Sequence, residues 1–226
     1  MATQPLTLVF DLDGTLVDTA PDLIAATNHV LDRMGRPLSS DALLRPQVGH
    51  GALAMIRAGI GEEAATWNEE KLYPLFDAFI AYYTANISAL SRPFPGLIAA
   101  LDRAQAAGHT FAVCTNKQER LARQLLAELG LEHRFAAIAG RDTFAVYKPD
   151  PGHLTGTIAQ ARGSAARSVM VGDSGVDVAT AKAAGIPVIA VSFGYSEPAV
   201  ASFDPDALIH HYDDFDAALA RVRAAT

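Results

Sequence analysis

The chain has 226 residues, half of them hydrophobic, and a formal net charge of −7 at pH 7. This length and apolar content allow a sizeable core in one large domain, or a main domain with a smaller one. The negative charge argues against general binding to nucleic acid or anionic membranes, because both require a cationic protein surface. A small anionic substrate remains possible, since a binding site can be locally positive within an acidic protein.

Cysteine usage and the N-terminus bear on the compartment. Cys114 is the only cysteine, so no intramolecular disulfide can form, which is typical of a reducing environment. The first five residues, Met-Ala-Thr-Gln-Pro, lack the basic segment of a signal peptide. No apolar run approaches the roughly 20 residues that span a bilayer. These features predict a cytoplasmic protein without a membrane partner.

The first apolar segment, Leu8–Phe10, predicts a buried strand, and Asp11 and Asp13 follow it directly. Residues i and i+2 of an extended chain point the same way, so both carboxylates are expected on one side. Two adjacent carboxylates repel each other unless a proton or a cation separates them. A solvated strand-to-turn junction is the alternative, because Asp and Gly are common in turns. The spacing Asp-x-Asp-Gly-Thr favours a cation site.

Helical patterns fill the next part of the chain. A first helix is expected from Thr19, which can cap it, with Pro21 in its first turn and Asp22 at its positive end. Further helices are expected from about residue 41, over 52–58 and over 69–86, with no strand among them. The pattern predicts an all-helical domain over 17–91, inserted into a core made of 1–16 and 92–226.

Strands and helices alternate from Pro93 onward. Strands are expected over 110–114, 135–139, 168–172, 187–191 and near 207–210. Helices are expected between them, two of them near 153–161 and 178–184, and a last one follows from about residue 215. Strands joined by helical crossovers predict a Rossmann-like α/β fold, with a parallel sheet and helices on both faces.

Polar side chains follow several of these strands. Ligands of such sheets bind at the carboxyl ends of the strands. The residues expected there are Asp11, Asp13, Thr115, Asn116, Asp173 and Asp177, with Lys148 in the loop after another strand. The fold rule alone brings these distant segments to one edge of the sheet.

The chemistry of this set favours phosphate and a hard cation. Carboxylates without histidine or cysteine suit Mg²⁺, while Lys148, Thr115 and Asn116 suit phosphate oxygens. One carboxylate can become an aspartyl phosphate, and a second can move protons. Two alternatives stay open here. Lys148 can be a solvated loop lysine, and Asp177 can be a first-turn aspartate that favours the helix dipole.

Four segments resemble the motifs of the haloacid dehalogenase-like superfamily, in the order of that superfamily. They are Asp11-Leu-Asp13-Gly-Thr15, the strand-terminal Thr115, Lys148-Pro and Gly172-Asp173-Ser-Gly-Val-Asp177. The inserted helical domain resembles the small helical cap of these proteins. The resemblance implies a Mg²⁺-dependent phosphohydrolase acting on a small phosphorylated substrate.

The resemblance also implies roles for the catalytic residues. Asp11 would be the nucleophile that becomes phosphorylated, and Asp13 the general acid and base. Thr115 and Lys148 would hold the transferring phosphoryl group, and Lys148 would also orient Asp11.

A metal site is implied in the same way. Asp11, the backbone carbonyl of Asp13, and Asp173 would bind Mg²⁺, and Asp177 would support Asp173 or position the waters of the metal. Asp13 is also informative about the reaction, because the dehalogenases and the phosphonate-cleaving members of the superfamily lack this acid. Its presence favours transfer of phosphate from an oxygen leaving group.

Within the superfamily, the resemblance is to bacterial phosphoglycolate phosphatases, which implies hydrolysis of 2-phosphoglycolate to glycolate and phosphate. It rests on Phe10–Pro21, Val48–Gly51, Thr115–Lys117, Lys148–Pro151 and Phe193–Tyr195. A sugar-phosphate phosphatase and a β-phosphoglucomutase-like enzyme stay open as alternatives. A receiver-like signalling protein and a non-catalytic phosphate-binding protein are the non-enzyme alternatives.

The helical domain supplies candidates for binding the substrate carboxylate. Arg45 offers a cation, and the break at Gly49 and His50 offers backbone N–H groups. Arg45 can instead be a surface arginine, and His50 can instead have a turn or helix-cap role. The linkers near 16–20 and 88–95 are expected to act as hinges. A monomer and a homodimer are both compatible with the sequence.

Overall fold

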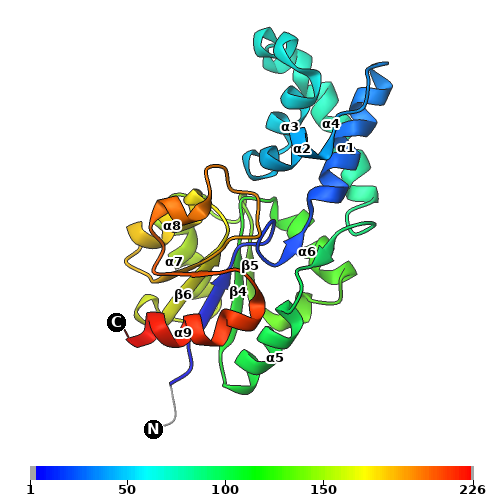
Figure 1. Cartoon of the computed structure of the whole chain (residues 1–226). Helices are drawn as coiled ribbons and strands as arrows, with labels where there is room; N and C mark the ends of the chain where they lie inside the picture. Colours follow the sequence, from blue (N-terminus) through cyan, green and yellow to red (C-terminus); the bar gives the residue numbers. More distant parts are fainter. Residues whose placement is uncertain (1–3, 225–226) are drawn as a thin grey trace. The chain divides into compact units, whose positions relative to one another are not determined.

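The computed structural model describes residues 4–224, which divide into two compact units (Figure 1). One unit is formed by the described residues up to Val17 together with those from Pro93 onward. The other unit is Asp18–Arg92. Both of its bounds lie one residue later in the chain than those of the expected insertion, 17–91.

A parallel sheet forms the centre of the larger unit. Among the described residues it has six strands in the order β5-β4-β1-β6-β7-β8, with every neighbouring pair parallel. The strands are β1 (Thr7–Phe10), β4 (Thr110–Cys114), β5 (Phe135–Ala139), β6 (Ser168–Gly172), β7 (Val188–Val191) and β8 (Ala207–Ile209). The expected α/β architecture is confirmed, and β1 lies between β4 and β6.

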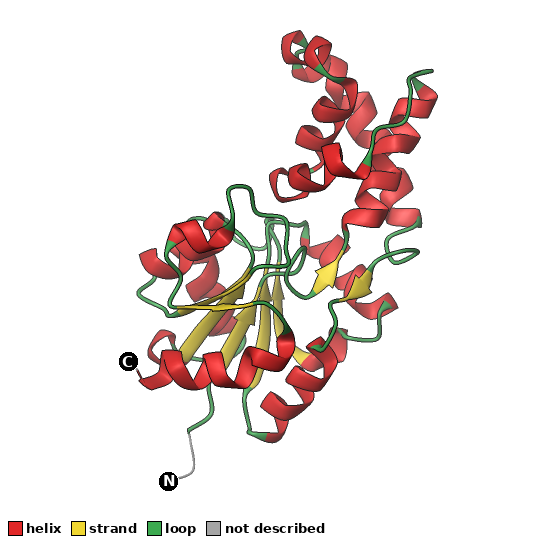
Figure 2. Ribbon diagram, in the orientation of Figure 1, coloured by secondary structure: helices red, strands yellow, loops and turns green. Residues whose placement is uncertain are grey.

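Helices cover both faces of this sheet (Figure 2). They are α5 (Leu97–Ala106), α6 (Glu119–Glu128), α7 (Pro151–Gln160), α8 (Gly175–Ala183) and α9 (Phe215–Ala224). Val9 packs with Leu154 of α7 and Val178 of α8 in one buried cluster. The ring of Phe10, the next residue, contacts Phe215 of α9 instead. Successive residues of β1 therefore enter opposite layers, as the alternation of a strand requires.

Helix α8 begins at Gly175 rather than near Val178. Ser174 and Asp177 form a capping box, in which each side chain accepts the backbone N–H of the other residue. The capping box closes the first turn three residues earlier than the apolar pattern indicates. This turn therefore places Asp177 immediately after the carboxyl end of β6.

The helical unit contains α1 (Ala20–Arg33), α2 (Asp41–Leu44), α3 (Ala52–Ile60) and α4 (Glu69–Ala85). Helix α1 packs against α3 and α4. Helix α3 continues through Gly59, where an added Cβ would lie 3.1 Å from Leu31, so the glycine permits close packing on α1. Strands β2 (Val17–Asp18) and β3 (Arg92–Pro93) pair where the chain passes between the units. Across residues 4–224, no helix has the length and apolarity needed to cross a membrane.

The start of α1 differs from the expectation. Thr19 occupies the N-cap position without a side-chain cap hydrogen bond, and Asp18 Oδ1 accepts the N–H of Ala20 at 3.3 Å instead. Asp22 is buried and does more than face the helix dipole. Its carboxylate accepts the N–H groups of Leu90 and Ser91, at 3.0 and 2.7 Å, and the Ser91 hydroxyl at 2.6 Å. Asp22 thus ties the first helix to the last residues of the helical unit.

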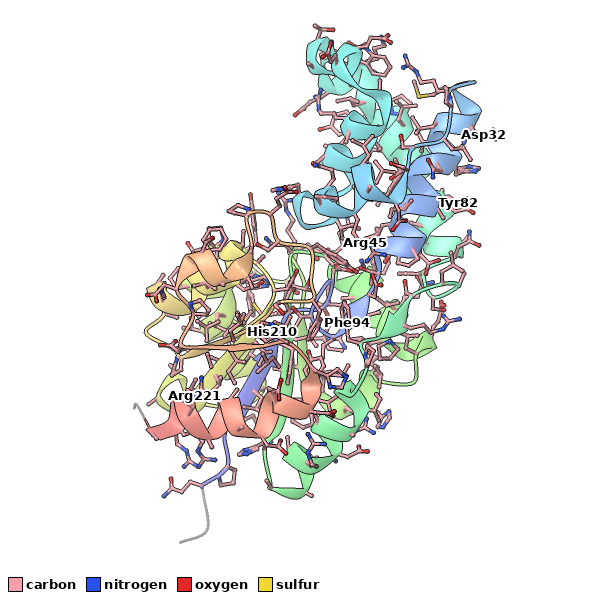
Figure 3. The ribbon with its side chains drawn as sticks, in the orientation of Figure 1. Asp32, Arg45, Tyr82, Phe94, His210 and Arg221 are labelled. Carbon is pink, nitrogen blue, oxygen red and sulfur yellow. The ribbon has the colours of Figure 1, made fainter. Side chains whose placement is uncertain are left out.

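Replacing this buried acceptor should destabilise the helical unit. In Asp22→Asn, an amide N–H₂ replaces one oxygen that accepts three donors, and a buried donor without a partner costs about 1–3 kcal/mol. We expect a fall of several degrees in the melting temperature. Asp32→Asn is the matched control, because Asp32 is an exposed residue of the same helix (Figure 3). Equal melting temperatures of the two variants would contradict the role assigned to Asp22.

Candidate active site

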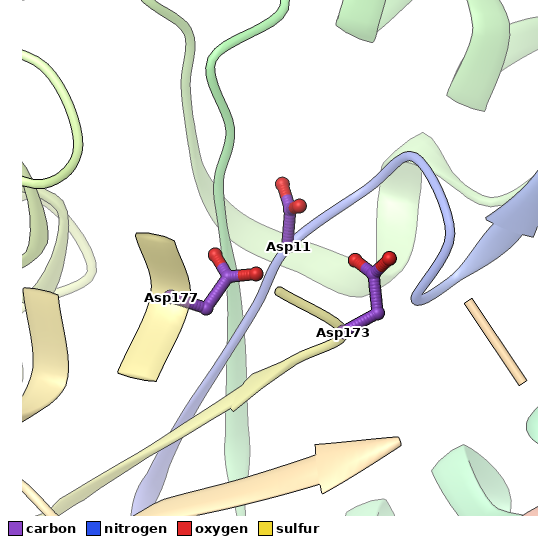
Figure 4. A group of neighbouring side chains, drawn as sticks. All are labelled: Asp11, Asp173 and Asp177. Atoms are coloured by element: carbon purple, nitrogen blue, oxygen red, sulfur yellow. The ribbon is translucent and has the colours of Figure 1, made fainter. Parts of the chain in front are cut away.

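The carboxyl edge of the sheet brings together side chains that are far apart in the sequence. Asp11 follows β1 and Asp173 follows β6, and the N–H of Asp11 continues the ladder by donating to Val171 O at 2.9 Å. Carboxylate oxygens of Asp11, Asp173 and Asp177 lie within 4.8 Å of one another. Figure 4 shows these three carboxylates at the ends of adjacent segments. The convergence inferred from the strand ends is therefore present.

Lys148 lies inside this cluster. Its Nζ is 2.9 Å from Asp11 Oδ1 and 2.6 Å from Asp177 Oδ1, and its side chain is 2% exposed. The backbone is held as well, because the N–H of Lys148 donates to His153 Nδ1 at 3.2 Å. The peptide bond to Pro149 is cis. The alternative of a solvated loop lysine is therefore wrong.

Asn116 and Thr115 have different functions in the structure. Asn116 Nδ2 donates to the carbonyl of Lys148 at 2.9 Å, so this amide holds the Lys148 backbone, whereas a direct phosphate contact was expected. Thr115 is buried, and its Oγ1 accepts the N–H of Lys117 at 3.2 Å. That contact uses the oxygen as an acceptor and leaves the hydroxyl hydrogen to be donated. Thr115 therefore retains the donor that a phosphate oxygen needs.

Asp173 is held by donors that the sequence analysis did not assign. Thr15 Oγ1 donates to Asp173 Oδ1 at 3.1 Å, and the N–H of Tyr195 donates to Oδ2 at 2.8 Å. The chain approaches so closely that a Cβ on Gly14 or Gly194 would lie 2.5 or 2.3 Å from Oδ2. Gly14 also has φ +83°, which other residues rarely adopt. Both glycines are therefore required by the position of this carboxylate.

Asp177 uses both of its carboxylate oxygens. Oδ1 pairs with Lys148, while Oδ2 accepts the N–H of Ser174 at 3.1 Å and its hydroxyl at 2.6 Å. Asp177 thus caps α8, as expected of an aspartate in the first turn of a helix. It also holds the ammonium of Lys148 in place. The carboxylates of Asp11 and Asp173 are the ones better placed for a metal ion.

Burial and mutual repulsion shift the pKa values of the groups in this cluster. Burial raises the pKa of Asp11 to about 6, with Lys148 opposing and Asp177 adding to the rise. Burial, and then the charges of Asp177 and Asp11, raise the pKa of Asp173 well above its usual value. Burial alone would lower the pKa of Lys148, but the two neighbouring carboxylates outweigh it and raise that pKa. Three carboxylates and one ammonium leave excess negative charge, and an all-oxygen set of this kind fits Mg²⁺.

Asp13 lies outside this group of three carboxylates. Lys117 Nζ is 2.8 Å from Asp13 Oδ1, and the side chains are 6% and 19% exposed, respectively. Sequence reasoning assigned no function to Lys117, Thr15 or Tyr195. The signal that could have identified Lys117 is its place directly after Thr115 and Asn116, in the turn that ends a central strand.

The candidates of the helical unit lie in one short segment, the 3₁₀ helix Arg45–His50. Arg45, which is labelled in Figure 3, is half-buried. It pairs with Asp18 at 3.1 Å and with Asp41 at 3.2 Å, so two carboxylates of its own unit compensate its charge. Gly49 and His50 are exposed. The structure describes these residues within the helical unit, and the cluster at the sheet edge is built without them.

The raised pKa of Asp11 predicts that Asp11→Asn stabilises the metal-free protein at neutral pH. The folded state favours the protonated form of Asp11, because the pKa of this carboxyl group is about 6 in the folded protein and ordinarily 3.8. The protonated group therefore contributes its full stabilisation below pH 3.8, and this contribution is lost as the pH rises through 6. We therefore expect a gain of about 1–3 kcal/mol at pH 7.5 in the presence of EDTA.

Urea unfolding at several pH values measures this gain, which should shrink toward zero near pH 4. Wild-type protein at the same pH values is the reference. A variant that is less stable than the wild type at pH 7.5 would contradict the electrostatic account.

Comparisons with known proteins identify the family of the chain. The family model of haloacid dehalogenase-like hydrolases matches residues 8–191. A phosphoglycolate phosphatase of Mesorhizobium japonicum is 48% identical over 220 residues, covering 96% of this chain and 97% of that protein. A phosphoglycolate phosphatase of Agrobacterium fabrum is 46% identical, covering 96% and 93%.

Solved structures show the same relationship. The crystal structure of a predicted phosphoglycolate phosphatase from Haemophilus somnus superposes with a TM-score of 0.86 at 27% identity, covering 95% of this chain and 98% of that one. The family inferred from the sequence motifs is confirmed. The chain belongs to the family of haloacid dehalogenase-like hydrolases.

Proposed function

We propose that this protein hydrolyses 2-phosphoglycolate to glycolate and inorganic phosphate, through a phosphoryl group carried on Asp11 and with Mg²⁺ as cofactor. The observation that carries the proposal is the buried Asp11 carboxylate, paired with Lys148 at 2.9 Å and gathered with Asp173. Two relatives that align along nearly the whole chain are named phosphoglycolate phosphatases. The names support this substrate, and the cluster supports the chemistry.

In the first step, a carboxylate oxygen of Asp11 attacks phosphorus, and the bond between phosphorus and the ester oxygen of the substrate breaks. Lys148 and the Thr115 hydroxyl hold the oxygens of the transferring group. Asp13 donates its proton to the departing oxygen, which leaves as the hydroxyl of glycolate. A bound Mg²⁺ would reduce the repulsion between the Asp11 carboxylate and the anionic phosphate.

In the second step, the Asp13 carboxylate takes a proton from water, and the water oxygen attacks phosphorus. The bond between phosphorus and the Asp11 oxygen breaks, inorganic phosphate leaves, and Asp13 has regained its proton. Asp11 and Asp13 thus have separate functions, and their surroundings differ accordingly. Asp11 is paired with Lys148, whereas Asp13 is paired with Lys117.

Arg45, Gly49 and His50 are the candidate substrate contacts of the helical unit, and Arg45 is the alternative to a cation of the sheet edge for binding the substrate carboxylate. Arg45 would have to exchange one of its carboxylate partners, Asp18 or Asp41, for the carboxylate of the substrate. The substitution Arg45→Met tests this contact, because loss of the preference for a carboxylate on the leaving group in this variant would assign that carboxylate to Arg45.

A phosphate-release assay tests the proposed function. The purified protein with Mg²⁺ should release inorganic phosphate from 2-phosphoglycolate with a kcat/KM at least about 10-fold above those for hexose, pentose and nucleoside monophosphates, because a matched charge contact is worth about 1.5–3 kcal/mol. Asp11→Asn should lower turnover by about 10⁴-fold or more, as loss of a nucleophile does.

Three outcomes would contradict the proposal. A higher kcat/KM for a sugar phosphate would move the substrate to that class, and isomerisation without phosphate release would indicate a mutase. Absence of metal-dependent hydrolysis across the whole panel would indicate a non-catalytic protein.

A further inference from the structure

Lys117 is a buried lysine to which the proposed reaction assigns no function. It lies in the turn between β4 and α6, and its side chain is 6% exposed. Its Nζ is 2.8 Å from Asp13 Oδ1 and 3.2 Å from Oδ2. An ammonium group removed from water requires compensating negative charge, and in this structure Asp13 provides it.

The backbone of Lys117 is fixed on both sides. Its N–H donates to Thr115 Oγ1 at 3.2 Å, and its carbonyl accepts the N–H of Arg141 at 2.9 Å. The loop after β5 approaches so closely that a Cβ on Gly140 would lie 2.6 Å from the Lys117 carbonyl oxygen. The turn that presents Thr115 therefore also presents the ammonium of Lys117 in a defined place.

The partner of Lys117 indicates which part of a substrate it can reach. Lys148 and Thr115 are assigned to the transferring phosphoryl group, whereas Asp13 is assigned to the ester oxygen of the leaving group. Because Lys117 is within hydrogen-bond distance of Asp13, it lies on the leaving-group side. In 2-phosphoglycolate a single methylene separates the ester oxygen from the carboxylate. An ammonium beside the general acid is thus within reach of that carboxylate.

We propose that Lys117 is the residue that selects for a carboxylate on the leaving group. Without substrate its ammonium pairs with Asp13, and with substrate it pairs with the substrate carboxylate. A phosphate ester without this carboxylate has nothing to offer Lys117. The inference rests on the proposed function, because it concerns specificity within the same reaction.

The test compares 2-phosphoglycolate with its carboxamide, an uncharged substrate of nearly the same shape and the same phosphoryl bond. The ratio of the two kcat/KM values measures the preference for the carboxylate. Lys117→Met keeps much of the apolar stem and removes the charge, and should lower this ratio by about 10- to 100-fold. Lys117→Arg keeps the charge and should retain part of the preference. Lys182→Met is the matched control, since Lys182 is exposed and pairs with Asp204.

Each outcome of the test has a distinct meaning. If Lys117→Met slows both substrates equally and keeps the ratio, Lys117 only positions Asp13, and the specificity proposal is wrong. If Arg45→Met rather than Lys117→Met removes the preference, the carboxylate is bound by the helical unit. If the wild type does not prefer the carboxylate, the proposed substrate fails together with this inference.

Discussion

Negative charge is in excess at the carboxyl edge of the sheet, and the surrounding backbone must hold the repelling carboxylates together. Three buried carboxylates lie together, and one buried ammonium pairs with two of them, Asp11 and Asp177. Burial first, and then the neighbouring carboxylates, raise the pKa values of Asp11 and Asp173. Such an arrangement destabilises the fold unless a cation or protons compensate it. It persists because the surrounding backbone is heavily constrained. Two glycines admit Asp173, and a capping box holds Asp177 against Lys148.

The same constraint separates the functions of the carboxylates. In the proposed reaction Asp11 attacks the phosphorus of an anionic phosphate group, which requires that the charges of this carboxylate and of the substrate be compensated. Asp177 uses both oxygens for Lys148 and Ser174, which leaves it a positioning residue. Asp13 pairs with Lys117 outside this group of carboxylates, and the proposed reaction assigns the two proton transfers to it.

Much of this site could be predicted from the sequence. The apolar strands were recognisable, and the rule for parallel sheets placed Asp11, Thr115 and Asp173 at one edge because that rule depends on topology alone. Other features depend on contacts between distant residues. Lys117 follows a strand as an ordinary turn lysine would, and only the fold brings it to Asp13. Likewise, the sequence does not distinguish a phosphate from the Lys148 carbonyl as the partner of the Asn116 amide, because only the folded loop brings that carbonyl within reach.

A trapped protein intermediate would test whether Asp11 accepts the phosphoryl group, as proposed. In Asp13→Asn, p-nitrophenyl phosphate can still transfer its phosphoryl group because its leaving group needs no acid, whereas water lacks its base. Intact-protein mass spectrometry after acid quenching should show one added phosphoryl group in this variant, located on Asp11 by peptide analysis. The double variant that also carries Asp11→Asn should show none. A phosphoryl group on another residue, or an equal amount in the double variant, would contradict the account.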